Sequence, residues 1–171
     1  MRAAGHRVEH LEMVTPAQAA RLAELGVTAS VQPLFDALWG GPAGMYAERL
    51  GAERAAPMNP FAALRDAGVP LALGSDAPVT PVGPWEAVQA AVAHRTPGSG
   101  ITPRQALAAH TAGGHRAGGD RSPLAGRLVA GAPATYAVWD GPGPLDGGPP
   151  PRCLRTVHRG AVLHAAAALL A

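Results

Sequence analysis

His10 and Asp76 are the two side chains whose types and positions could carry chemistry. His10 ends a predicted strand at residues 7–10, and Asp76 lies just beyond a short apolar strand predicted at residues 71–73. A carboxylate in that place lies at the rim of a sheet or barrel, where α/β folds keep their catalytic groups. Asp76 could ligate a metal, act as a general base or cap a turn, and the dipeptide Ser75-Asp76 leaves these three roles open.

Histidine and aspartate together suit a divalent metal such as Zn²⁺. A catalytic zinc site normally takes three protein ligands and a water, so His10 and Asp76 would form an incomplete set. Their separation suits two intervening strand–helix connections. The residues alone therefore indicate either a metal site completed elsewhere or no metal site.

Strands and helices are predicted to alternate along the first two thirds of the chain. Thr15 and Pro16 suit the start of a helix, as do Thr102 and Pro103 further on. Residues 34–60 are predicted as a long Gly- and Pro-rich loop with a short helix at residues 45–50. The remaining predicted strands are residues 27–31 and 69–74, and the remaining helices are residues 16–25, 60–67, 84–94 and 103–110. This order predicts an α/β fold with parallel strands joined by right-handed crossovers.

The pattern changes near Gly126. Residues 113–133 show no helical or strand period, and strands are expected at residues 135–139 and 154–162, the second with a turn at Arg159-Gly160. This predicts two parts, 1–125 and 126–171, the second a β appendage. The first part has three strand–helix units, too few to close an eight-stranded barrel of about 250 residues.

Composition excludes several classes of function. All 14 basic residues are Arg, they are scattered, and the net charge is +2, so no nucleic-acid partner is expected. The single Cys153 allows no intrachain disulfide, and no apolar run reaches the ~20 residues that span a bilayer. The N-terminus lacks the apolar segment of a secretory signal, so we expect a cytoplasmic protein without a membrane partner.

Four motifs in order carry a resemblance to a known family. They are HRVEH at residues 6–10, GVTASVQP at residues 26–33, LRDAGVPLALGSDAPV at residues 64–79 and AGAPATYAVWD at residues 130–140. Together they resemble the C-terminal part of the amidohydrolase family 3 proteins, which are metal-dependent hydrolases. The resemblance implies the last three units of a (β/α)₈ TIM barrel with strands of a small β-sandwich. It also implies hydrolysis of a carbon–nitrogen bond in a small-molecule amide-type substrate.

The resemblance also assigns roles to the two residues. His10 matches the metal histidine of the sixth barrel strand, and Asp76 matches the eighth-strand aspartate that binds metal and takes a proton from water. The metal ligands that the family carries on its earlier strands have no counterpart here. We therefore expect a C-terminal fragment that is inactive by itself. The alternatives are a non-catalytic remnant, a half-barrel that needs a separate N-terminal chain, or a homo-oligomer of half-barrels.

Other polar and aromatic residues are assigned lesser roles. His6 is a weaker candidate ligand, Glu9 is expected to pair with an Arg, and Ser75 is expected to shape the turn around Asp76. The remaining expectations are substrate contact for Gln32 and Phe35, helix-dipole positions for His94 and His110, places in the appendage for His115, His158 and His164, and core packing for Trp85 and Trp139.

Overall fold

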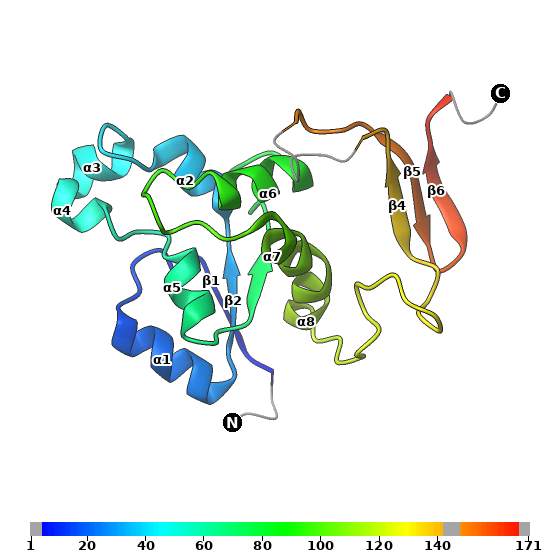
Figure 1. Cartoon of the computed structure of the whole chain (residues 1–171), viewed down its shortest axis with the longest axis horizontal. Coiled ribbons are helices and arrows are strands. Elements are labelled where there is room, and N and C mark those ends of the chain that lie inside the picture. The colour runs from blue at the N-terminus through cyan, green and yellow to red at the C-terminus, as the bar shows by residue number, and fades with distance from the viewer. Residues whose placement is uncertain (1–4, 142–147, 168–171) are drawn as a thin grey trace.

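A computed structural model describes residues 5–141 and 148–167. Its first half is built on a three-stranded parallel sheet of β1 (Arg7–Glu9), β2 (Thr28–Val31) and β3 (Leu71–Leu73). The strand order is β1-β2-β3, with Val8 opposite Ala29 and Ala29 opposite Leu71 (Figure 1). The predicted parallel arrangement is confirmed. A closed barrel is not formed by these strands.

Helix α1 (Pro16–Leu25) shows why the predicted helix boundaries hold. The Thr15 side chain accepts a hydrogen bond from the Gln18 backbone N–H, and the Gln18 side-chain oxygen accepts one from the Thr15 backbone N–H, which completes a capping box. At the other end Gly26 takes a left-handed conformation with φ 66°, which ends the helix.

The segment predicted as a long loop is largely helical, so that prediction is wrong. It contains α2 (Pro33–Trp39), α3 (Met45–Leu50), which was predicted, and α4 (Ala52–Ala55). Pro33 occupies the first turn of α2, where its missing N–H costs nothing, and Phe35 is buried. The glycines and prolines therefore separate short helices rather than form one irregular loop.

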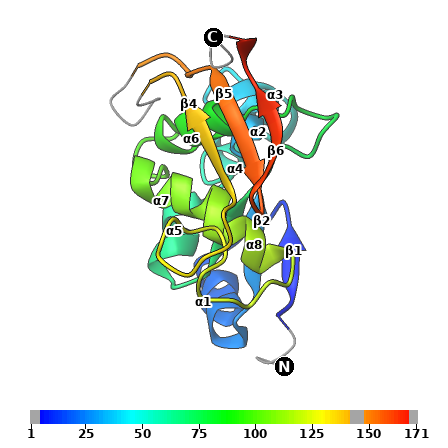
Figure 2. The ribbon, with the colours of Figure 1, turned by 90° about the vertical axis from the view of Figure 1, so that its right-hand side faces the viewer.

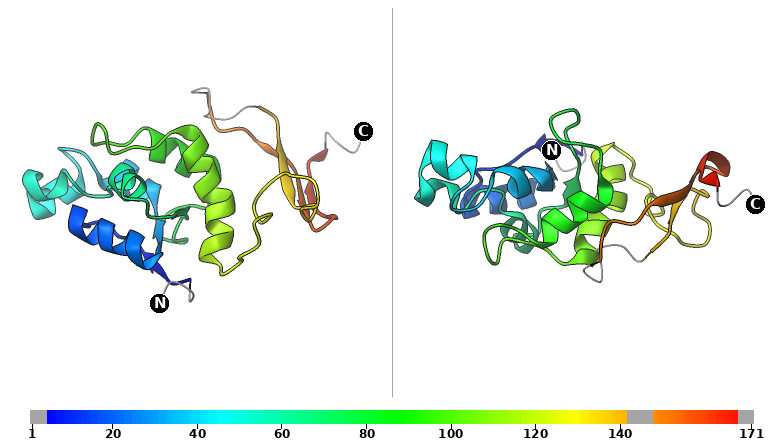
Figure 3. Two further views of the ribbon diagram at one scale, coloured as in Figure 1. Left: turned by 60° about the horizontal axis from the view of Figure 1, so that its bottom comes forward. Right: turned by 90° about the horizontal axis from the view of Figure 1, so that it is seen from above.

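A single continuous helix lies beside β3. After α5 (Phe61–Asp66) and α6 (Pro84–Val92), helix α7 (Pro103–Ala108) runs through the π-helical turn η2 (Ala109–Gly113) into α8 (Gly114–Ala117) (Figure 3). The sequence predicted its end near residue 110. A Cβ on Gly113 would lie 2.2 Å from the Leu71 carbonyl oxygen, so a glycine is needed where this helix meets the strand.

Apolar side chains between the parallel sheet and the helices form the core. Ala29, Phe61, Leu64 and Ala106 are 0% exposed. The cluster also contains Ala19, Val31, Val69, Leu73, Trp85, Val88, Ala91, Ile101 and Ala109. Burial of this surface is the main force that holds the short strands in place.

The second sheet is antiparallel and contains β4 (Tyr136–Trp139), β5 (Cys153–His158) and β6 (Ala161–Ala165). The predicted turn at Arg159-Gly160 joins β5 to β6, and both residues have positive φ, as a tight hairpin turn requires. Figures 1 and 2 show this sheet beside α6, α7 and α8. Part of the Pro/Gly-rich stretch before β5 lies outside the described residues. No helix within the described ranges is long and apolar enough to cross a membrane.

Candidate functional site

The carboxyl ends of the three parallel strands bring the predicted residues to one edge of the sheet. His10 directly follows β1, Gln32 directly follows β2, and Asp76 is the third residue after β3. Because β2 lies between the other two strands, His10 and Asp76 come from strands about 9–10 Å apart. The sequence prediction of a shared edge agrees with this topology.

His10 has its backbone fixed by the neighbouring strand. Its N–H donates to the Ser30 carbonyl at 2.8 Å, and its φ of 69° lies in the left-handed region. The imidazole stacks on the Phe35 ring with the ring centroids 5.8 Å apart and the planes 16° apart. Its Nδ1 is buried and has no hydrogen-bond partner among the described residues. An unpaired buried nitrogen is the kind of atom that a ligand or ion would satisfy.

Asp76 lies in a turn that its neighbours build. Its φ is 55°, its carbonyl accepts from the Val79 N–H at 2.8 Å, and its side chain is exposed. Ser75 shapes this turn as predicted, since its Oγ accepts from the Ala77 N–H at 3.2 Å and its carbonyl accepts from the Thr80 hydroxyl. Positive φ at non-glycine residues is uncommon and occurs often at functional sites. Both residues singled out by the sequence show it.

The described residues do not make a metal site by themselves. Nowhere in residues 5–141 and 148–167 do three His, Cys, Asp or Glu side chains come close enough to hold a metal ion. His6, the residue before β1, is exposed. The assignment of His10 and Asp76 as metal ligands therefore stays a prediction, and further ligands would have to come from outside the described residues.

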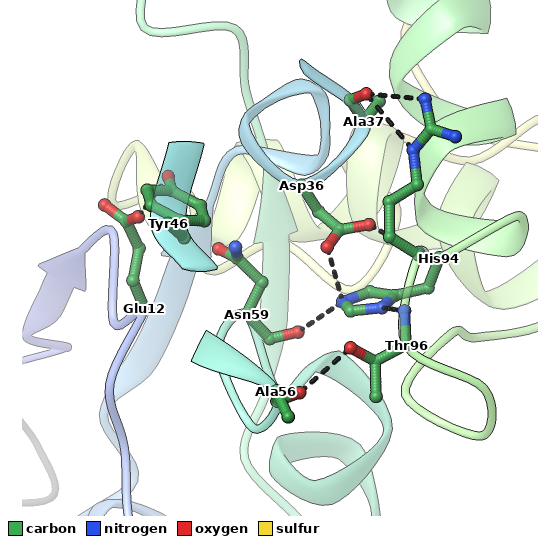
Figure 4. A network of polar contacts seen from close by, with 9 residues as sticks. Glu12, Asp36, Ala37, Tyr46, Ala56, Asn59, His94 and Thr96 are labelled. Atoms are coloured by element: carbon green, nitrogen blue, oxygen red, sulfur yellow. Dashed lines mark hydrogen bonds and ion pairs between the residues drawn. The ribbon is translucent and has the colours of Figure 1, made fainter. Parts of the chain in front are cut away.

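A buried polar network joins α2 to the loop that follows α6 (Figure 4). The side chains of Asp36 and His94 are 4% and 1% exposed, and His94 Nε2 lies 3.5 Å from Asp36 Oδ1. His94 lies two positions beyond α6, near a helix end as predicted, but its side chain is enclosed by protein and contacts Asp36, which was not predicted. Asp36 is not among the predicted site residues, because residues 34–60 are predicted as a loop. The signal that could have found it is Gln32-Pro33, which fits the start of a helix.

Tyr46 and Glu12 make a second polar contact near this network. The Tyr46 hydroxyl donates to Glu12 Oε2 at 2.5 Å. Burial raises the pKa of Tyr46 above its ordinary value, and the nearby Glu12 carboxylate raises it further. Tyr46 is therefore a hydrogen-bond donor at neutral pH. It ties α3 to the segment that follows His10.

Two other histidines have surroundings different from those expected, whereas Glu9 has its predicted partner. His110 lies inside the α7–α8 helix rather than at its end, and burial lowers its pKa, so a cationic role at a helix end is wrong. His115 lies in α8 rather than in the β appendage, with its Nδ1 3.3 Å from Asp120. Glu9 pairs with Arg7 at 2.7 Å as predicted.

Trp85 and Trp139 pack together, as the sequence predicted for core residues. Their rings meet edge to face with centroids 5.6 Å apart. Trp85 is buried, and Trp139 is half-buried against the core cluster. This contact joins the antiparallel sheet to the helices.

Comparison with known proteins places these features in a family. The sequence model of the amidohydrolase family matches residues 1–164. An imidazolonepropionase from Anaeromyxobacter sp. (strain K) is 35% identical over 135 residues, which cover 77% of this chain and 27% of that protein. The protein LONG AFTER FAR-RED 3 of Arabidopsis thaliana is 38% identical over 89 residues, which cover 50% of this chain and 14% of that protein.

Solved structures of hydrolases share the fold of this chain. An uncharacterized metal-dependent hydrolase from Pyrococcus furiosus matches with a TM-score of 0.65 and 29% identity, covering 75% of this chain and 26% of that one. Atrazine chlorohydrolase TrzN from Arthrobacter aurescens TC1, in complex with zinc, shows the same fold with a TM-score of 0.66 at 20% identity, covering 93% of this chain and 36% of that one. The chain thus spans between about a seventh and a third of the lengths of these relatives. Because the family match extends over nearly all of its residues, this chain belongs to the amidohydrolase family.

Proposed function

We propose that this chain is the C-terminal part of a metal-dependent hydrolase that cleaves carbon–nitrogen bonds in small amide-type molecules. The observation that carries the proposal is the placing of His10 and Asp76 at the same edge of a parallel sheet, each at positive φ. Family membership and the metal-dependent hydrolase relatives support it. Zinc is the first candidate metal, because one structural relative binds it.

The chemistry follows from the residue types. A bound divalent metal would lower the pKa of a bound water and polarise the substrate carbonyl. His10 would be a ligand through its imidazole. Asp76, whose carboxylate is exposed beside the end of β3, would accept the proton from the attacking water and return it to the leaving amine. We place both residues in the part of the protein at 1–125, with 126–171 as sandwich strands, and we propose a cytoplasmic location.

The strand β1 favours a second candidate, in which this chain needs another chain or a second copy to act. All three residues of β1 are exposed, although strands of parallel sheets are usually covered on both faces. One edge of β1 is paired with β2, and within the described residues no strand pairs with the other. A separate N-terminal half or a homo-oligomer could cover this strand and supply the missing ligands. A non-catalytic remnant would bind no metal.

Zinc binding by the purified chain tests the proposal. We expect zinc to bind weakly to the wild-type chain, because two ligands are fewer than a zinc site normally uses. Each of H10A and D76A should abolish this binding, whereas D66A, which removes an exposed aspartate from α5, should leave it unchanged. Isothermal titration with zinc chloride measures the affinity, and light scattering gives the oligomeric state of the same sample. Equal zinc affinity in the wild type and the H10A/D76A double variant would contradict the proposal.

In an active assembly, whether an oligomer or a complex with a second chain, D76N provides the test of the proton-transfer role. Removing a general base typically lowers kcat by about 10²–10⁴-fold. We expect a loss in this range with KM changed much less, measured by release of the amine product. Full kcat in D76N would contradict the assignment of Asp76 as the base.

A further inference from the structure

Helix α2 lies between His10 and the buried network described above. Phe35 stacks on the His10 ring, and the next residue, Asp36, points toward the loop after α6 (Figure 4). Two adjacent residues of one helix turn therefore have different partners: Phe35 contacts the candidate ligand His10, and Asp36 belongs to the buried network. Any contact that fixes Asp36 also fixes the place of the Phe35 ring.

The Asp36 carboxylate is held by donors from the loop after α6. Its Oδ2 accepts from the Arg95 backbone N–H at 2.7 Å, and its Oδ1 faces His94 Nε2. The Arg95 guanidinium also donates to the Ala37 carbonyl at 2.9 Å, from the same loop to the same helix. A Cβ on Gly40 would lie 2.2 Å from Asp36 Oδ1, so the carboxylate fills the space at the end of α2.

Hydrogen bonding fixes the tautomer of His94. The Thr96 backbone N–H donates to His94 Nδ1 at 2.9 Å, so Nδ1 must present a lone pair and the proton lies on Nε2. That Nε2–H donates to the Asn59 carbonyl at 3.0 Å and faces Asp36. His94 is thus a neutral ring that joins α2 to the turn before α5.

Asn59 connects this network to the segment that follows β1. Its backbone N–H donates to the Glu12 carbonyl at 2.8 Å, and Glu12 is two residues beyond His10. The Tyr46 hydroxyl holds the Glu12 side chain. The contacts therefore form a closed path from His10 through α2, the loop after α6 and the Asn59 turn back to the chain next to His10.

We infer that Asp36 and His94 are positioning residues that hold α2 in place, so that Phe35 fixes the orientation of the His10 imidazole. The His10 Nδ1 has no hydrogen-bond partner within the described residues, so at that atom ring packing takes the place of the hydrogen bond that usually orients a ligand histidine. The use of this orientation in catalysis rests on the proposed function. That Asp36 and His94 fix α2, and with it the Phe35 ring, does not depend on the proposed function.

NMR of the metal-free chain tests this inference. Imidazole spectra at about pH 8, where an ordinary histidine is neutral, report the His10 ring protons and their NOEs to Phe35. We expect D36A and H94A to shift the His10 signals toward those of F35L and to lose the His10–Phe35 NOEs. D36N keeps an acceptor for the Arg95 N–H but turns an NH₂ group toward His94 Nε2–H, so it should shift the His10 signals less than D36A does. The exposed control D66A should change nothing.

A purely structural role for the network would give a different result. D36A and H94A would then fold, by circular dichroism, with wild-type His10 signals and NOEs while F35L alone moved them, and that outcome would overturn the inference. If D36A does not fold, H94A provides the same readout, since it removes the ring that faces Asp36 Oδ1. All samples are free of metal, so failure of zinc binding would count against the proposed function and leave this inference standing.

Discussion

The two sheets of this chain differ in how they are supported. In the parallel sheet, β2 and β3 pack apolar side chains against α1, α5, α6 and α7, and the residues of this core are almost fully buried. In the antiparallel sheet Val157 is buried, whereas Val162 and Leu163 are 57% and 68% exposed. Similar apolar residues are therefore core in one region and surface in the other.

The difference teaches where the stability of the described structure lies. The antiparallel sheet meets the helices through the Trp85–Trp139 contact and around a cavity of about 840 Å³, which both parts line. Short strands gain stability mainly from the surface they bury against other elements. We infer that the first region holds most of the folding free energy, and the following predictions test this contrast.

The largest expected effect comes from Phe61→Ala. The ring is 0% exposed in the core under the parallel sheet, so its loss should lower the free energy of unfolding by about 3–5 kcal/mol. Urea denaturation followed by circular dichroism measures this. The smaller change Val162→Ala, at a residue 57% exposed in the antiparallel sheet, should stay within about 0.5 kcal/mol. Equal costs for the two variants would mean that the sheets are supported alike.

An intermediate effect is expected for Trp139→Ala, which removes the aromatic contact between the two regions. We expect a loss of about 1–2 kcal/mol, because the ring is half-buried and the edge-to-face pair adds to its packing. Emission from Trp85 should shift to longer wavelength as water reaches its ring, and proteolysis between α8 and β4 should become faster. The control Trp39→Phe lies outside this contact. Unchanged Trp85 emission would show that the regions are held together by other contacts.

The smallest effect concerns pH. Burial lowers the pKa of His110 from its ordinary value of 6.5, so the folded state binds this proton less readily than the unfolded state. The contribution of neutral His110 is therefore complete above about pH 6.5 and is lost as the pH falls through the lowered pKa. Stability measured from about pH 8 to about pH 5 should fall less steeply in His110→Gln than in the wild type. The same slope in both proteins would contradict this role for His110.

Local sequence signals predicted much of the fold. Threonine caps followed by proline marked the starts of α1 and α7, and Gly26 marked the end of α1. These signals succeed because capping depends on residues within one turn of the helix. The α2 helix was missed, because its seven residues lie among glycines and prolines and gain their stability from packing of Phe35 and pairing of Asp36. Helices of that length depend on tertiary contacts, which no local pattern records.

Only part of the candidate site could be predicted, again because sequence patterns record local signals and not tertiary contacts. His10 and Asp76 could be found because each follows a recognisable strand, and parallel strands bring their carboxyl ends to one edge. Asp36, His94 and Asn59 could not be linked in the same way. His94 lies 35 positions from Asn59 and 58 positions from Asp36 in the sequence. Contacts over such separations form only when the chain packs.

The sequence by itself determined the order of strands and helices, the parallel sheet and the place of His10 and Asp76 at its rim. Those features follow from apolar runs, turn residues and caps, whose physics is local. Tertiary structure alone decided that His94 is a neutral buried ring, that Phe35 faces His10, and that β1 stays exposed. Each of these depends on which distant surfaces exclude water from one another, and that is settled only when the whole chain packs.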